Sequence, residues 1–188
     1  MPAPAMADPG DADVQRAFAL HLVVAVATLG LYMPVWLAQR DETVRERVPD
    51  PDWLPGAWAL GAGTALGLIA RGLFGDTSPR VALGLSLLAV VVFLVGFYQV
   101  SRHAREACEV LGLRGPLKPA VGTAAIGLVF FGVELGNEIA SWWMRGPVVA
   151  LVLGLPYVFW RLHVAFETIE AATPDPEPAD EAASASTS

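Results

Sequence analysis

Two acids and one arginine are the residues best suited to chemistry. Glu134 and Glu138 are four residues apart near the end of an apolar segment, so a helix places both carboxylates on one face. Carboxylates at membrane depth are costly and often line a proton or cation path. Arg71 ends another apolar segment at a matching expected depth, where it would instead neutralise the acids in a structural ion pair. Both interpretations stay open.

The histidines and the single cysteine do not predict a metal centre. His21 is expected toward the outer leaflet, whereas His103 and His163 are expected on the inner side, where Cys108 should be accessible. No Ser-His-Asp set, phosphate-binding loop or HExxH motif occurs in the sequence. We therefore expect no enzyme activity, no cofactor and no metal.

The segments around these groups have the composition of a membrane protein. Of the 188 residues, 54% are hydrophobic and only 16% are charged, with a mean hydropathy of +0.49. Windows without Asp, Glu, Lys or Arg cover residues 17–39, 54–70, 81–101, 119–133 and 146–160. A bilayer core of about 30 Å requires roughly 20 helical residues. The sequence predicts an all-α integral membrane bundle of five transmembrane helices, with four helices plus a re-entrant segment as the alternative.

Charge predicts the orientation and the ends of the domain. With the N-terminus outside, 8 of the 12 basic residues lie on the inner side, which favours a cytoplasmic C-terminus in the cell membrane. The first basic residue is Arg16, so we expect no signal peptide. Residues 1–16 and the acidic tail 171–188 are expected to be disordered around a transmembrane domain of residues 17–170. The net charge of −7 argues against nucleic-acid binding.

An aromatic motif recurs where three expected spans end on the inner side. It comprises Gly30, Tyr32 and Trp36, then Tyr98, then Tyr157 and Trp160. Aromatic rings with a polar tip favour the headgroup level, so we expect these rings at the cytoplasmic interface. Charged helical extensions should follow over residues 37–48, 102–111 and 161–170. In the first, Asp41 and Arg45 are spaced for a surface ion pair, and Gly112 should end the second.

The first motif carries a family resemblance. The segment from Thr28 through Tyr32 and Trp36 to Glu42, with a looser echo from Tyr157 to Glu167, resembles prokaryotic membrane proteins catalogued as domain of unknown function 4234. The resemblance covers about a third of the chain and implies a multi-spanning prokaryotic membrane protein. It brings no established activity or catalytic residues.

Glycines suggest how the helices pack. Gly63 and Gly67 form a GxxxG motif, which allows close helix packing within the chain or in a homo-oligomer. Because the expected membrane core has few polar groups, we expect a membrane-embedded interaction or organising protein that contacts the lipid bilayer and a protein partner. The alternative is a small transporter or channel using Glu134, Glu138 and Arg71.

Overall fold

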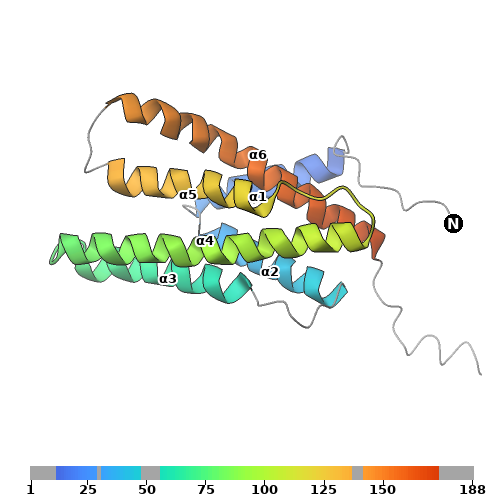
Figure 1. The fold of residues 1–188 in the computed structure, drawn as a ribbon, viewed down its shortest axis with the longest axis horizontal. Helices are drawn as coiled ribbons and strands as arrows, with labels where there is room; N and C mark the ends of the chain where they lie inside the picture. Colours follow the sequence, from blue (N-terminus) through green and yellow to red (C-terminus); the bar gives the residue numbers. More distant parts are fainter. Residues whose placement is uncertain (1–11, 29–30, 48–55, 137–141, 174–188) are drawn as a thin grey trace, which may run out of the picture.

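The computed structural model describes residues 12–28, 31–47, 56–136 and 142–173, and their side chains except at 26, 132–136 and 142–153. In these ranges the chain is all-α, and its helices pack side by side along one long axis (Figure 1). The six helices are α1 Ala12–Ala27, α2 Tyr32–Arg47, α3 Gly56–Phe74, α4 Pro79–Val110, α5 Pro119–Gly136 and α6 Trp142–Ala172.

The all-α fold is confirmed, but the described residues form six helices and not five, because the first apolar window spans parts of two of them. Helices α1 and α2 have 16 residues each and are therefore about 24 Å long, shorter than the hydrocarbon core. Thr28 binds to both helices at the break. Its hydroxyl donates to the Val24 carbonyl at 2.8 Å and accepts from the Tyr32 amide at 3.2 Å. The Tyr32 amide, at the first residue of α2, lacks a partner within that helix and finds one in the Thr28 hydroxyl.

Helices α1 and α2 fold back as a hairpin against α6. Along α1, the contacted positions of α6 decrease in number, since Val14 contacts His163 and Phe18 contacts Trp160. Along α2 they increase, since Trp36 contacts His163 and Arg40 contacts Glu167. Helix α1 is thus antiparallel to α6, whereas α2 is parallel to it. The start of α1 and the end of α6 lie at the same end of the molecule (Figure 1).

Helices α3 and α4 form the closest pair and contain the two candidate membrane spans. Glycines allow the contact: a Cβ added to Gly63 would lie 2.6 Å from the Phe93 amide nitrogen, and one added to Gly96 would lie 2.6 Å from that of Leu60. Both distances are shorter than real contacts permit, so each glycine is required for the approach. Among the described helices, α3 and α4 are long and apolar enough to cross a membrane, whereas the apolar part of α5, Pro119–Phe131, is shorter.

The second expected extension is confirmed as the last part of α4. The helix continues to Val110, with Ala104 and Cys108 fully buried. Burial of Cys108 corrects the expectation that its thiol is accessible from the inner side. Gly112 ends the helix as predicted. Its φ of 68° lets the Leu113 amide donate to the Cys108 carbonyl at 2.7 Å, as in a Schellman motif.

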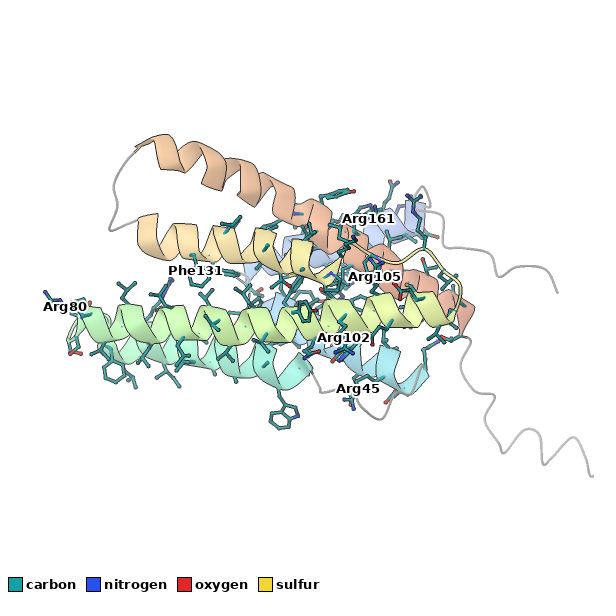
Figure 2. All side chains as sticks on the ribbon, viewed as in Figure 1. Arg45, Arg80, Arg102, Arg105, Phe131 and Arg161 are labelled. Atoms are coloured by element: carbon teal, nitrogen blue, oxygen red, sulfur yellow. The ribbon has the colours of Figure 1, made fainter. Side chains whose placement is uncertain are left out.

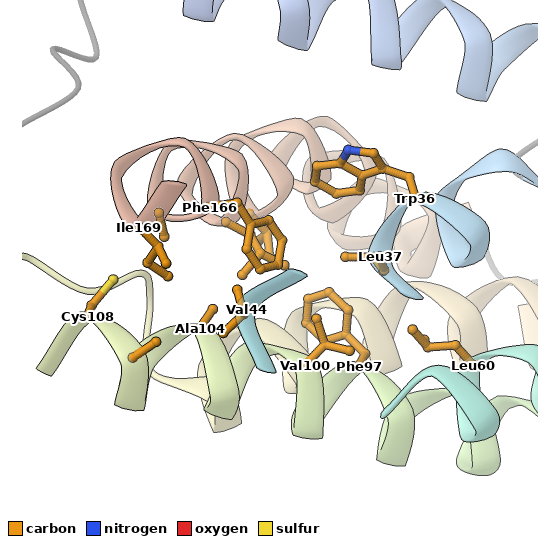
Figure 3. Packing of buried hydrophobic residues seen from close by; sticks show 14 of the residues in the cluster. Trp36, Leu37, Val44, Leu60, Phe97, Val100, Ala104, Cys108, Phe166 and Ile169 are labelled. Atoms are coloured by element: carbon orange, nitrogen blue, oxygen red, sulfur yellow. The ribbon is translucent and has the colours of Figure 1, made fainter. Parts of the chain in front are cut away.

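The hydrophobic core lies where α2, the start of α3, and the second halves of α4 and α6 meet. Figure 3 shows this packing. Its large side chains come from five helices: Trp36, Leu37 and Val44 from α2, Leu60 from α3, Phe97 and Val100 from α4, Ile126 from α5, and Phe166 and Ile169 from α6. The core therefore occupies the end of the molecule that contains the hairpin.

Candidate functional site

The most buried polar pair among the described residues connects α2 to α4. Asp41 and His103 are each 1% exposed, and His103 Nδ1 donates to Asp41 Oδ1 over 2.5 Å. The second carboxylate oxygen, Oδ2, accepts from the Gly56 backbone amide at 3.1 Å. Because Gly56 is the first residue of α3, its amide lacks a partner within that helix. Asp41 therefore holds α2, α3 and α4 together with one carboxylate.

This arrangement corrects the expected surface ion pair between Asp41 and Arg45. Asp41 lies on the buried face of α2 with Leu37 and Val44, at i−4 and i+3. The sequence did contain a signal for this burial: a helix places Asp41 on the same face as the apolar residues Leu37 and Val44. The partner His103 could not be inferred, since it lies 62 residues away.

A second polar group connects α2 to the end of α6. Arg40 pairs with Glu167 at 2.7 Å and also with Glu170. Arg47 contacts Glu170 at 3.7 Å and donates to the Thr173 carbonyl. These side chains are partly buried, so water screens the pairs less than it screens fully exposed ones.

An aromatic cluster fills the space between α1, α2 and α6. His21 Nδ1 lies 2.7 Å from the Tyr32 hydroxyl, and the His21 ring centroid lies 5.4 Å from Trp36 and 5.6 Å from His163. The sequence predicts that His21 and His163 lie on opposite sides of the membrane, because the first window is expected to cross it. That separation is wrong, since the hairpin returns His21 to the level of His163.

His163 and Trp36 each bury a polar atom in this cluster. His163 Nε2 lies 3.3 Å from the Val14 carbonyl and donates to it, which leaves Nδ1 as an acceptor. His163 Nδ1 and Trp36 Nε1 have no hydrogen-bond partner among the described groups. Burial is the main cause that lowers the pKa of His163 to about 4, and the positive charge of Arg40 acts in the same direction. His163 is therefore neutral at physiological pH.

The chemistry available to these groups is limited by access and ligand number. An Asp–His pair orients a catalytic base in many enzymes, but here both members are only 1% exposed. Over the described part of the chain, no three His, Cys, Asp or Glu side chains gather as a metal site requires. The described contacts of these groups join α2 to α4 and to α6.

A cavity of about 470 Å³ lies beyond the hairpin, between α2, α3, α4, α5 and α6. Leu31, Met33 and Pro34 border it at the hairpin tip. Apolar side chains make up most of the remaining lining, with Thr64, Ser86 and Arg71 as the polar exceptions. The Thr64 hydroxyl already donates to the Leu60 carbonyl at 2.8 Å. The cavity is thus suited to an apolar occupant.

The acid–arginine group is only partly described. Arg71 lies near the end of α3 and borders the cavity. Glu134 belongs to α5, but its side chain lies outside the described residues, as does all of Glu138. The expected ion pair with Arg71 therefore stays a prediction. Gly63 and Gly67 also border the cavity, and Gly63 packs against α4 of the same chain.

The aromatic motif residues occupy different environments. Tyr98 and Tyr157 are 40% and 54% exposed, and Tyr32 and Trp160 are partly buried. Trp36 is only 3% exposed and packs against Phe166. Protein contacts thus replace the headgroup contact expected for its ring, because the hairpin turns it toward α6. Gly30 lies outside the described residues.

No protein-family model, curated protein or solved structure shows significant similarity to this chain. The resemblance to domain of unknown function 4234 therefore stays a hypothesis.

Proposed function

We propose that this chain is an integral membrane protein in which α3, α4, α5 and the charge-free residues 146–160 of α6 cross the bilayer. The supporting observation is that only 17% and 33% of the residues in the apolar windows of α3 and α4 are buried inside the protein. Central helices of soluble domains are mostly buried, whereas membrane helices turn apolar side chains toward lipid. Exposed large apolar residues lie along three helices: Leu68, Ile69, Leu73, Val81, Leu88, Val91, Val95, Val121 and Leu128.

The hairpin suggests a topology different from the one that the sequence predicted. With α1 and α2 re-entering from one side and four helices crossing, both chain ends lie on the same side. Nine of the 12 basic residues then lie on that side, since only Arg71, Arg80 and Arg145 remain opposite. Figure 2 shows Arg45, Arg102, Arg105 and Arg161 in the half that contains α2, with Arg80 at the opposite tip. We therefore propose cytoplasmic N- and C-termini.

Thiol labelling in intact cells tests this topology. Buried Cys108 serves as the unreactive background, and Ala3→Cys and Ser186→Cys add one thiol near each end. We expect an impermeant reagent to label neither variant until the cells are opened. Labelling of Ala3→Cys alone in sealed cells would restore the arrangement with the N-terminus outside.

Within the membrane, the function best supported is that of an interaction or organising protein. The charged groups of the hairpin end bind one another, as in Asp41 with His103 and Arg40 with Glu167. These contacts join α2 to α4 and to α6, while the apolar surface stays available to lipid and to a protein partner or second copy. Mild-detergent purification with crosslinking tests this role. A reproducible partner or homo-oligomer supports it, and a solitary monomer that moves a solute in vesicles contradicts it.

A small transporter or channel is the second candidate, and the cavity is the observation that favours it. Arg71, Thr64 and Ser86 border this space, and the sequence contains few other polar groups at that depth. A path for ions would use Glu134 and Glu138 as its outer acids. Proton and cation flux into proteoliposomes, with Glu134→Gln as the matched variant, tests this function. Equal flux in both proteins, at the level of empty vesicles, would exclude it.

A further inference from the structure

We propose that the cavity binds one acyl chain of an anionic phospholipid, with the lipid headgroup beside Arg71. This inference rests on the proposed membrane location. It begins with the position of the cavity opening. The residues that line the cavity include Leu31, Leu68 and Phe130, which are 47%, 55% and 39% exposed. The cavity therefore opens among side chains that a membrane protein turns toward lipid.

The interior of the cavity is apolar and buried. Ala89, Val90, Ile126 and Val129 line it and are all less than a tenth exposed. A cavity of about 470 Å³ lies within the range of roughly 300–1,000 Å³ that is usual for small-ligand sites. Walls of this kind leave a polar solute without hydrogen bonds, whereas they give a hydrocarbon chain dispersion contacts.

Charge gives the occupant its orientation. Arg71 follows Gly63 by eight residues on α3, so it lies about 12 Å farther along the helix axis, toward the end opposite the hairpin. The hairpin tip at Met33 and Pro34 borders the cavity at its other end. A chain that enters from the outer leaflet would therefore extend toward the hairpin and keep its headgroup near Arg71. A guanidinium group binds phosphate strongly, including when it also contacts another group.

Native mass spectrometry of the full chain tests the proposal. The protein is released from nanodiscs that contain equal amounts of phosphatidylglycerol and phosphatidylcholine. We expect one retained lipid per chain, with phosphatidylglycerol preferred about fivefold because one basic residue near a membrane surface favours an anionic lipid to this extent. Arg71→Gln should remove the preference while a lipid is still retained.

Gly67→Leu tests occupancy of the cavity itself. Gly67 lines the cavity, and a Cβ added there meets only the Ala89 Cβ at 3.7 Å, so a larger side chain fills the space and displaces the acyl chain. We expect about tenfold lower retention of lipid. Gly72→Leu is the matched control on α3, because a Cβ there meets nothing within 4 Å. It should retain lipid as the unmodified chain does.

The outcomes separate this proposal from the membrane assignment. Extraction of the chain from membranes by alkaline carbonate would overturn the assignment. A chain that resists extraction but retains no lipid, or equal retention in Gly67→Leu and Gly72→Leu, would overturn only the lipid site. Should Gly67→Leu fail to fold, Arg71→Gln decides the test, since an unchanged lipid preference in that variant contradicts the headgroup contact.

Discussion

The two ends of this molecule are stabilised by different means. At the hairpin end, Asp41 and His103 are buried and Arg40 is partly buried, and each is paired across helices that are far apart in the sequence. At the opposite end, α3 and α4 approach through glycines and expose apolar side chains on their outer faces. The hairpin end thus pairs Asp41, His103 and Arg40 within the protein, whereas the proposed membrane location would leave lipid to cover the apolar surface of the other end.

Removal of the Asp41 carboxylate should cause the largest loss of stability, because it breaks the most buried polar contact of the hairpin end. Asp41→Ala leaves His103 Nδ1 and the Gly56 amide without their acceptor, so we expect a loss of about 3–5 kcal/mol in the free energy of unfolding. Denaturant titration in detergent measures it. Glu42→Ala, on the exposed side of α2, is the control and should change stability by less than about 0.5 kcal/mol. Similar losses in both variants would show that the polar end is not held by this pair.

Acid should weaken the hairpin end next most strongly, through His163. The pKa of His163 is about 4 in the folded protein, whereas an unperturbed histidine has a pKa of 6.5. Between these pH values the unfolded chain binds a proton that the folded chain does not, so stability is complete above pH 6.5 and is lost as pH falls toward 4. The loss should be about 3 kcal/mol.

Unfolding measured from about pH 7 to pH 4, with His163→Gln for comparison, tests this expectation. His21 on α1, Arg40 on α2 and Glu167 on α6 face His163 and are the same in both proteins. The difference between the two curves therefore isolates His163. Parallel curves would mean that its protonation does not affect folding.

Substitutions of the α3 glycines should change the free energy of unfolding by less than the changes at Asp41 and His163. Gly63→Ala places its Cβ against the α4 backbone and should cost about 1–3 kcal/mol, because backbone atoms cannot yield as a flexible side chain can. Gly67→Ala has ordinary contact distances and gains helix propensity, so it should be neutral or stabilising. Thermal unfolding of the two variants compares them directly. Equal destabilisation would contradict the assignment of Gly63 to the close contact.

The smallest expected effect concerns the partly buried pair between α2 and α6. A double-mutant cycle with Arg40→Gln and Glu167→Gln should give a coupling energy of about 1 kcal/mol, since both side chains retain contact with solvent. The coupling should decrease in high salt. If the two losses of stability were strictly additive, Arg40 and Glu167 would not stabilise each other. The polar stabilisation of this end would then come from Asp41 and His103.

Helical segments could be predicted well from local sequence, whereas partners between helices could not. The apolar face of the extension around Cys108 and its end at Gly112 follow from spacing and turn chemistry. The break after Thr28 was missed because an uninterrupted apolar window gives the same hydropathy whether it crosses the bilayer or folds back. The cluster of His21 with His163 depended on that break, and 142 positions separate the two residues in the chain.

The hairpin also determines the order in which the protein can be completed during synthesis. Helices α1 and α2 leave the ribosome before α6, and the residues that hold them to α6, including Glu167 and Glu170, are about 130 residues downstream of Arg40. At usual elongation rates, this interval corresponds to roughly ten seconds. During that time the nascent hairpin has neither its ion-pair partners nor the His163 contact. In the proposed membrane location, we therefore expect α3 and α4 to insert and pair before the hairpin docks, because docking requires α6.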